Sequence, residues 1–141
     1  MVLFNILFPS PPAGQTPAPE KMQDIFAYQE KIAKEGKLIW AERLHDAAKE
    51  SARIHIDGSG NSTVENGPFD GPSLGGYAVI DVADLNEAIA LVKDFPSGFP
   101  STTVEIRRVI DINDIPAPDA VKAKAKALRE LMAANAKKLH A

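Results

Sequence analysis

Two predicted strands are joined by the segment Asn66-Gly67-Pro68-Phe69-Asp70-Gly71-Pro72-Ser73-Leu74-Gly75-Gly76-Tyr77, which runs into the apolar stretch Ala78-Val79-Ile80-Asp81-Val82. Proline fixes φ and lacks an N–H, and glycine reaches positive φ without strain. The four glycines and two prolines therefore specify an irregular path rather than a helix or a strand. We expect a rigid, shaped loop. No nucleophile, metal-ligand set or cofactor fingerprint stands beside it, so the sequence does not name a ligand.

The composition fits one folded domain with a terminal appendage. The chain has 141 residues, 45% of them hydrophobic and 25% charged, which is enough for a real core. We expect a domain over residues 1–115 and a helical extension over residues 116–141. The absence of cysteine favours a reducing compartment, so we expect a cytoplasmic protein. The apolar start, residues 1–8, lacks a basic flank, and no other apolar run approaches the ~20 residues of a membrane helix, so we expect no membrane association.

The charge is distributed unevenly along the chain. Residues 117–141 carry six basic and two acidic side chains, which leaves ten basic and seventeen acidic side chains for the rest. The acidic body argues against nucleic-acid binding. Two readings of the basic tail stay open: it lies against an acidic surface of its own subunit or of a partner, or it is a solvated helix face.

Hydrophobic periodicity predicts the elements on both sides of the loop. The nearly continuous apolar run Val2–Phe8 is typical of a central strand that is buried on both faces. Five prolines between Pro9 and Pro19 exclude regular structure until a helix begins near Pro19 or Glu20, and Gly36 lies where a left-handed helix cap is expected. The other predicted strands are Leu38–Arg43, Ser51–Asp57, a short return strand at Thr63–Glu65, Tyr77–Val82 and Thr102–Ile110.

The order of elements predicts an α+β fold. Asp84 and Glu87 form a capping-box pattern at the start of a second helix, which Phe95-Pro96 ends. The resulting βαβββαβ order describes two split βαβ halves, so we expect a ferredoxin-like sandwich, an antiparallel sheet with both helices on one face. Soluble proteins rarely leave a large apolar face open. We therefore expect a homodimer whose sheets face each other and enclose a cleft.

An extra helix is predicted beyond Ile115-Pro116. Its apolar residues recur at steps of three and four and form a narrow stripe, which favours packing on a protein surface over a membrane-surface helix. The stripe comprises Val121, Ala125, Leu128, Met132, Asn135 and Leu139.

Several motifs resemble the YCII-related domain family, in its Asp-Gly-Pro-Phe branch. They are Asn66-Gly67-Pro68-Phe69, Leu74-Gly75-Gly76-Tyr77-Ala78-Val79-Ile80-Asp81-Val82, Asp84-Leu85-Asn86-Glu87-Ala88 and Val104-Glu105-Ile106-Arg107. The resemblance covers roughly Leu3 to Ile110. It implies a dimeric α/β barrel of ferredoxin-like subunits with a cleft between sheet and loop. The family's biochemical role is largely unassigned; some members are described as enzyme-like and others as linked to transcription initiation.

The chain departs from the family pattern at two places. Asn66 replaces the acid of the branch, and Asp70-Gly71-Pro72-Ser73 lacks the Glu-x-Lys that usually follows the phenylalanine. The small members of the family carry a His-Asp pair with the histidine in the first helix, whereas the helix Met22–Glu35 here contains no histidine. That pair therefore cannot be carried over, and the loop is better read as a wall or lid that holds Phe69 against a cleft.

Charged residues of the last strand are the first candidates for a site. Glu105 and Arg107 fall on one face, and both enter the cleft if Val104 and Ile106 face the helices. Two readings stay open: the two charges form an ion pair that fixes the dimer register, or Arg107 anchors a carboxylate or phosphate that Glu105 orients.

Histidine and aromatic residues complete the candidates. His45-Asp46 is better explained as a surface turn, whereas His55 shares a strand face with Arg53 and is a candidate for proton transfer, as is Glu105. So few scattered histidines make no zinc site, and we expect no metal and no cofactor. The predicted ligand-binding residues are Arg107, Arg53, Tyr77, Phe69 and Trp40.

Two functional classes remain after these observations. The first is a homodimer that binds a small molecule in the inter-sheet cleft, with cofactor-independent catalysis there. The second is a non-catalytic structural or regulatory interaction module, linked to transcription. An enclosed cavity near Arg107 and His55 favours the first class, and a cleft filled by side chains favours the second.

Overall fold

A computed structural model describes residues 2–11, 16–69, 73–96 and 102–140. Asp70, Gly71 and Pro72 of the glycine-proline loop lie outside the described residues, as do residues 12–15 and 97–101 of two other predicted loops. The chain divides into two compact units, Met1–Val109 and Ile110–Ala141, and each is described by itself.

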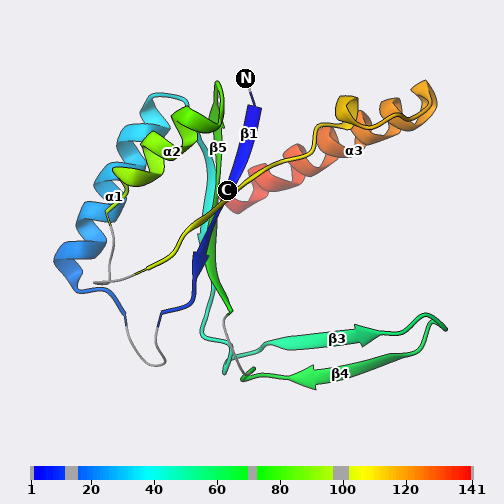
Figure 1. The fold of residues 1–141 in the computed structure, drawn as a ribbon, viewed down its shortest axis with the longest axis horizontal. Coiled ribbons are helices and arrows are strands. Elements are labelled where there is room, and N and C mark those ends of the chain that lie inside the picture. The colour runs from blue at the N-terminus through cyan, green and yellow to red at the C-terminus, as the bar shows by residue number, and fades with distance from the viewer. Residues whose placement is uncertain (1, 12–15, 70–72, 97–101, 141) are drawn as a thin grey trace. The chain divides into compact units, whose positions relative to one another are not determined.

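Four strands of the first unit form the main sheet (Figure 1). They are β1 (Val2–Pro9), β2 (Leu38–Arg43), β5 (Leu74–Val82) and β6 (Glu105–Arg108). The strand order is β2-β5-β1-β6, and every neighbouring pair is antiparallel. The helix after β1 leads to β2, and the helix after β5 leads to β6; in both cases one other strand lies between the two strands that the helix joins. The α+β class predicted from the sequence is confirmed.

The two helices of this unit lie on the same side of the main sheet (Figure 1). α1 (Pro19–Lys34) begins with proline in its first turn and ends just before Gly36, whose φ is +77°, as the sequence predicted. α2 (Leu85–Lys93) begins after Asp84, whose side chain accepts a 2.8 Å hydrogen bond from the Glu87 N–H. The Glu87 carboxylate accepts from the Ala83 N–H at 2.9 Å, one residue earlier than a capping box requires.

The core lies between these helices and the sheet. Alternate residues of β1 and β5 point to the helices because side chains alternate along a strand. The buried apolar residues are Phe4, Ile6, Ile32, Ala78, Ile80, Val82, Ala88 and Leu91. Val104, just before β6, and Ile106, within it, pack against this cluster. The opposite face of the sheet therefore receives the remaining side chains of all four strands.

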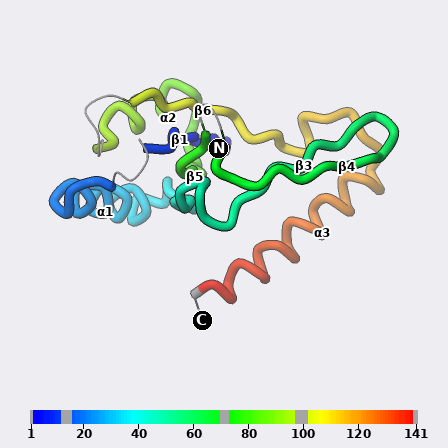
Figure 2. Tube along the Cα trace, turned by 90° about the horizontal axis from the view of Figure 1, so that it is seen from below, coloured from blue at the N-terminus to red at the C-terminus, as the bar shows by residue number. Residues whose placement is uncertain are grey.

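A separate hairpin replaces the third strand that the sequence predicted in the main sheet. β3 (Ala52–Ile56) pairs only with β4 (Ser62–Asn66) among the described strands, in a two-stranded sheet of its own. The short return strand is confirmed and is longer than predicted. In both views the hairpin projects from the main sheet on the side away from α1 (Figure 1, Figure 2).

The last strand is shorter than the predicted Thr102–Ile110. β6 covers only Glu105–Arg108, because its ladder with β1 runs only from the Leu7–Glu105 pair to the Phe4–Arg108 pair. One further backbone hydrogen bond, from the Val109 N–H to the Leu3 carbonyl at 2.9 Å, continues the pairing.

The second unit contains the C-terminal helix that the sequence predicted. It contains a short 3₁₀ turn, η1 (Ile112–Asp114), the helix α3 (Asp119–Ala136) and a final 3₁₀ turn, η2 (Lys137–His140). The predicted stripe leaves large apolar side chains in solvent: Val121, Leu128, Met132 and Leu139 are all exposed.

Candidate functional site

The open face of the main sheet carries four of the predicted site residues in two neighbouring rows. One row crosses the sheet as Trp40, Val79, Asn5 and Arg107, and the next as Glu42, Tyr77, Leu7 and Glu105. Since Val104 and Ile106 pack into the core, Glu105 and Arg107 point to the open face by strand alternation. The structure thus brings Trp40, Tyr77, Glu105 and Arg107 to one surface.

Glu105 and Arg107 form an ion pair on this surface. The Arg107 Nη1 lies 3.2 Å from the Glu105 Oε2, and 71% and 60% of the two side chains are exposed. Water screens an ion pair at such exposure, so the pair adds little to stability. Both groups therefore remain accessible to a ligand or to a second protein chain.

Asn5 lies between these charges and the aromatic residues. Its Oδ1 is buried and has no hydrogen-bond partner among the described residues. Because a buried acceptor without a donor is unfavourable, nearly all such atoms in folded proteins are paired. The middle of the open face thus holds a buried hydrogen-bond acceptor that no described residue pairs with.

His55 and Arg53 lie on the hairpin and not on the main sheet. His55 Nε2 lies 2.8 Å from the Glu65 Oε2, and 61% of the His55 side chain is exposed. The sequence predicted one ligand site near both Arg107 and His55, but these two residues lie on different sheets. Alternation along Ser51–Asp57 predicted a strand, but it did not tell which strand would pair with it.

Phe69 lies against Arg53 at the base of the hairpin. The Arg53 guanidinium carbon is 4.1 Å from the centroid of the Phe69 ring, a cation–π contact. Gly67 permits this arrangement because its backbone runs close to the Ala47–Ser51 turn. A Cβ at Gly67 would overlap the Ala47 carbonyl oxygen, and the Gly67 N–H donates to the Ser51 carbonyl at 3.0 Å.

A hollow of about 520 Å³ opens beside this contact. Its walls come from the connection between β2 and β3, the start of β3 and the two ends of the glycine-proline loop. Leu44, His45, Lys49, Arg53, Phe69 and Leu74 are the side chains that decide its chemistry. Sequence reasoning found Arg53 and Phe69 but missed Leu44, Lys49 and Leu74. Only the folded chain brings these three segments together, so periodicity gave no signal.

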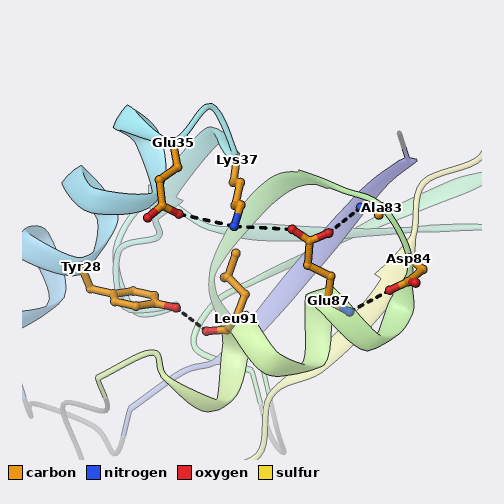
Figure 3. Close-up of polar contacts among 7 residues, drawn as sticks. All are labelled: Tyr28, Glu35, Lys37, Ala83, Asp84, Glu87 and Leu91. Carbon is orange, nitrogen blue, oxygen red and sulfur yellow. Dashed lines mark hydrogen bonds and ion pairs between the residues drawn. The ribbon is translucent and has the colours of Figure 1, made fainter.

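A second polar cluster lies on the helix side of the sheet, where Lys37 joins the end of α1 to α2 (Figure 3). The Lys37 Nζ is 3.4 Å from the Glu35 carboxylate and 3.5 Å from the Glu87 carboxylate. The hydrogen bond and charge of Glu35 raise the pKa of Lys37, and Glu87 adds to the rise. Both carboxylates bind Lys37, so the arrangement holds elements together rather than leaving a group free for catalysis.

Tyr28 contributes a further link between the two helices. Its hydroxyl donates to the Leu91 carbonyl oxygen at 2.6 Å (Figure 3). Burial is the main cause that raises the pKa of Tyr28, and the nearby carboxylates of Asp94 and Glu35 raise it further. A hydroxyl that is held neutral and donates to a carbonyl is structural here.

The described residues contain no cluster of metal-ligand side chains and no helix suited to span a membrane. Within the described ranges no three His, Asp or Glu side chains gather as metal ligands would. None of the described helices has the length and apolar character that crossing a membrane requires.

The fold and these surfaces define an α+β protein with one open sheet face and a separate hairpin. The model of the YCII-related domain matches residues 2–113, which is most of the chain. The chain therefore belongs to the YCII-related domain family, as its motifs suggested. The match ends in η1, just after the first compact unit. No curated protein matches the chain.

Proposed function

We propose that this protein is a homodimer of ferredoxin-like subunits that binds a small molecule between two facing sheets. The β2-β5-β1-β6 order and the two split βαβ units support the ferredoxin-like topology. The open face is the observation that carries the proposal. Both helices of the first unit lie on the other side of the sheet, and the open face combines Leu7, Tyr77, Val79 and Trp40 with the Glu105–Arg107 pair.

A second copy of the chain is the natural cover for this face. Folded proteins keep large apolar patches covered, and two equal faces can cover each other about a two-fold axis. Val79→Glu places a charge in the middle of the face and should convert the dimer to a monomer in light scattering at several concentrations. Leu85→Glu, on the exposed start of α2, is the matched control and should leave the dimer intact. A wild-type chain that is monomeric at every concentration contradicts the proposal.

Arg107 is the proposed anchor for a carboxylate or phosphate group of the ligand. Its guanidinium is accessible, and Glu105 lies beside it to orient a polar ligand. Trp40, at the other end of the same row, and Tyr77, in the next row, would form the walls. A thermal-shift screen of small acids and phosphate esters tests this role. Arg107→Ala should weaken binding of a hit about tenfold, the loss of one charge-assisted contact. Arg43→Ala, an exposed arginine of β2 outside these rows, should leave binding unchanged.

Cofactor-independent catalysis in the cleft is the enzymatic form of this proposal. Glu105 is the group that would transfer a proton beside Arg107, and His55 is the second candidate, on the hairpin. Glu105→Gln keeps the size of the side chain and removes its basicity. It should therefore abolish turnover of any substrate found while binding persists.

The alternative function is a non-catalytic structural or regulatory interaction module, linked to transcription. The exposed apolar side of the hairpin favours it: Ile54, Ile56 and Val64 are 62%, 74% and 64% exposed and lie on one side. An isolated two-stranded hairpin is marginally stable in water, so this side would gain from a protein partner. Two results together would support this alternative: no small molecule shifts the melting temperature of the wild type, and an Ile54→Ser, Val64→Ser double variant loses self-association in light scattering. For both functions we propose a cytoplasmic location, since a chain without cysteine has no need of an oxidising compartment.

A further inference from the structure

We infer that the hollow at the base of the β3–β4 hairpin is a second binding site and takes a small aromatic carboxylate. This place differs from the proposed inter-sheet cleft, because none of the residues that line it belongs to the Arg107 or Tyr77 rows. Its volume of about 520 Å³ lies within the ordinary range for small-molecule sites. The inference therefore stands or falls independently of the proposed function.

Arg53 supplies the group that would bind the anion. Its guanidinium lies over the Phe69 ring, and a guanidinium in this position keeps the N–H groups at its edge available. Glu65 lies directly opposite Arg53 in the hairpin register but pairs with His55. No carboxylate among the described residues forms an ion pair with Arg53. An open guanidinium edge matches a carboxylate, which accepts two parallel hydrogen bonds.

The apolar part of the hollow favours a ligand with an apolar ring. Leu44 and Leu74 line it and remain 46% and 44% exposed, and Phe69 adds an aromatic wall. A flat ring would cover these side chains and remove apolar surface from water, which stabilises the complex. Inorganic phosphate or acetate would satisfy Arg53 but leave the leucines in water. The lining thus favours an aromatic acid over a simple anion.

The other polar residues of the lining agree with an anionic ligand. The lining has two basic side chains, Lys49 and Arg53, and a single acidic one, Glu50. Glu50 also has a φ of +46°, the one positive value that a non-glycine residue takes in the described ranges. Such a backbone conformation is unfavourable for glutamate, and strained residues of this kind cluster at active sites and ligand-binding segments.

Hydrogen bonds hold the described wall segments of the hollow to one another. Backbone hydrogen bonds join Gly67 to Ser51 at 3.0 Å and Leu44 to Gly75 at 2.9 Å. The Ser73 hydroxyl donates to the Ser10 hydroxyl at 2.8 Å, and the Ser51 hydroxyl donates to the Ala47 carbonyl. A site with fixed walls loses little conformational entropy on binding.

The rival explanation is that Arg53 only pins the hairpin to Phe69. Titration of the full chain with benzoate, benzamide, acetate and inorganic phosphate distinguishes this explanation from a binding site. Calorimetry measures the affinities, and backbone amide NMR shifts locate the binding. We expect benzoate to bind about tenfold more tightly than the other three probes and to shift the amides of Lys49, Ser51 and Arg53. Each of the other probes lacks either the charge or the ring.

Variants assign the binding to the hollow. Arg53→Lys keeps the charge but loses the two-pronged geometry, and Phe69→Leu loses the ring; each should weaken benzoate binding by roughly fivefold to tenfold. Arg107→Ala should leave it unchanged, which keeps this test separate from that of the inter-sheet cleft. Lys49→Ala, an exposed change that spares the Phe69 contact, should also weaken binding and serves if Arg53→Lys fails to fold. Unchanged affinity in the Arg53 and Lys49 variants, equal affinity for phosphate, or amide shifts confined to β6 would overturn the inference.

Discussion

The Tyr28 hydroxyl donates a 2.6 Å hydrogen bond to the Leu91 carbonyl oxygen and so joins α1 to α2 across 63 residues of sequence. Leu91 is itself a core residue, and Tyr28 packs against the same cluster. The bond thus fixes the two helices over the sheet whose other face holds the proposed cleft.

Replacing Tyr28 by phenylalanine should destabilise the first unit. The change removes one partly buried hydrogen bond and leaves the Leu91 carbonyl without this donor, so we expect the free energy of unfolding to fall by about 1 kcal/mol. Urea unfolding measures it. Tyr77→Phe, which alters a hydroxyl on the open face, is the control and should change stability little. If both substitutions lower the free energy of unfolding equally, the hydrogen bond to Leu91 does not contribute measurably to stability.

The first unit should also lose stability at alkaline pH, where Tyr28 and Lys37 lose their protons. The pKa of Tyr28 is raised above 10.0 and that of Lys37 above 10.5, so the folded state holds both protons more tightly than the unfolded state. A raised pKa stabilises the fold below the unfolded value, and this stabilisation is lost as the pH rises through the folded value. The urea midpoint should decline over that range more steeply in wild type than in Tyr28→Phe. Parallel pH profiles would contradict the assignment.

Gly67 should tolerate no side chain. A Cβ there would overlap the Ala47 carbonyl oxygen, so Gly67→Ala must push the glycine-proline loop away from the 47–51 turn. We expect a loss of about 1–3 kcal/mol in the free energy of unfolding. Gly58→Ala is a matched control, since nothing lies within 4 Å of its Cβ position, and it should be nearly neutral. If both variants unfold at the same urea concentration, the close approach is not a constraint.

Local signals explain what the sequence predicted of the fold. The apolar run at Val2–Phe8, the cap at Gly36 and the Asp84 start of α2 each depend on a few neighbouring residues, and the structure has the central strand, the cap and the helix start. The expected burial of this strand on both faces was wrong, because only Phe4 and Ile6 of β1 are buried. The faces of Glu105 and Arg107 followed in the same way from strand alternation.

The choice of strand partners is a long-range property, and there the sequence was ambiguous. The alternation in Ser51–Asp57 suits a strand in any sheet with one solvated face, so it did not reveal that β3 leaves the main sheet. The irregularity between Leu38 and Trp40 in β2 likewise gives no local signal. The hollow beside Arg53 needs three distant segments at once, which is why only two of its decisive residues were found.

Asp57 should make the hairpin turn sensitive to acid. Its Oδ1 accepts hydrogen bonds from the Ser59 N–H at 2.8 Å and the Asn61 N–H at 3.0 Å, and these two bonds lower its pKa below the ordinary 3.8. A lowered pKa stabilises the turn above the unfolded value, and the effect is lost as the pH falls through the folded value. Protection of the Ser59 and Asn61 amides from hydrogen exchange should therefore decrease, relative to the intrinsic exchange rate, over this acidic range.

Two variants serve as controls. Asp57→Asn keeps an acceptor but cannot titrate, so protection of the two amides should be lower at neutral pH and should not change on acidification. Asp57→Ala should lose this protection at every pH. A wild-type turn whose protection does not change through the titration of Asp57 would show that the carboxylate does not hold the hairpin closed.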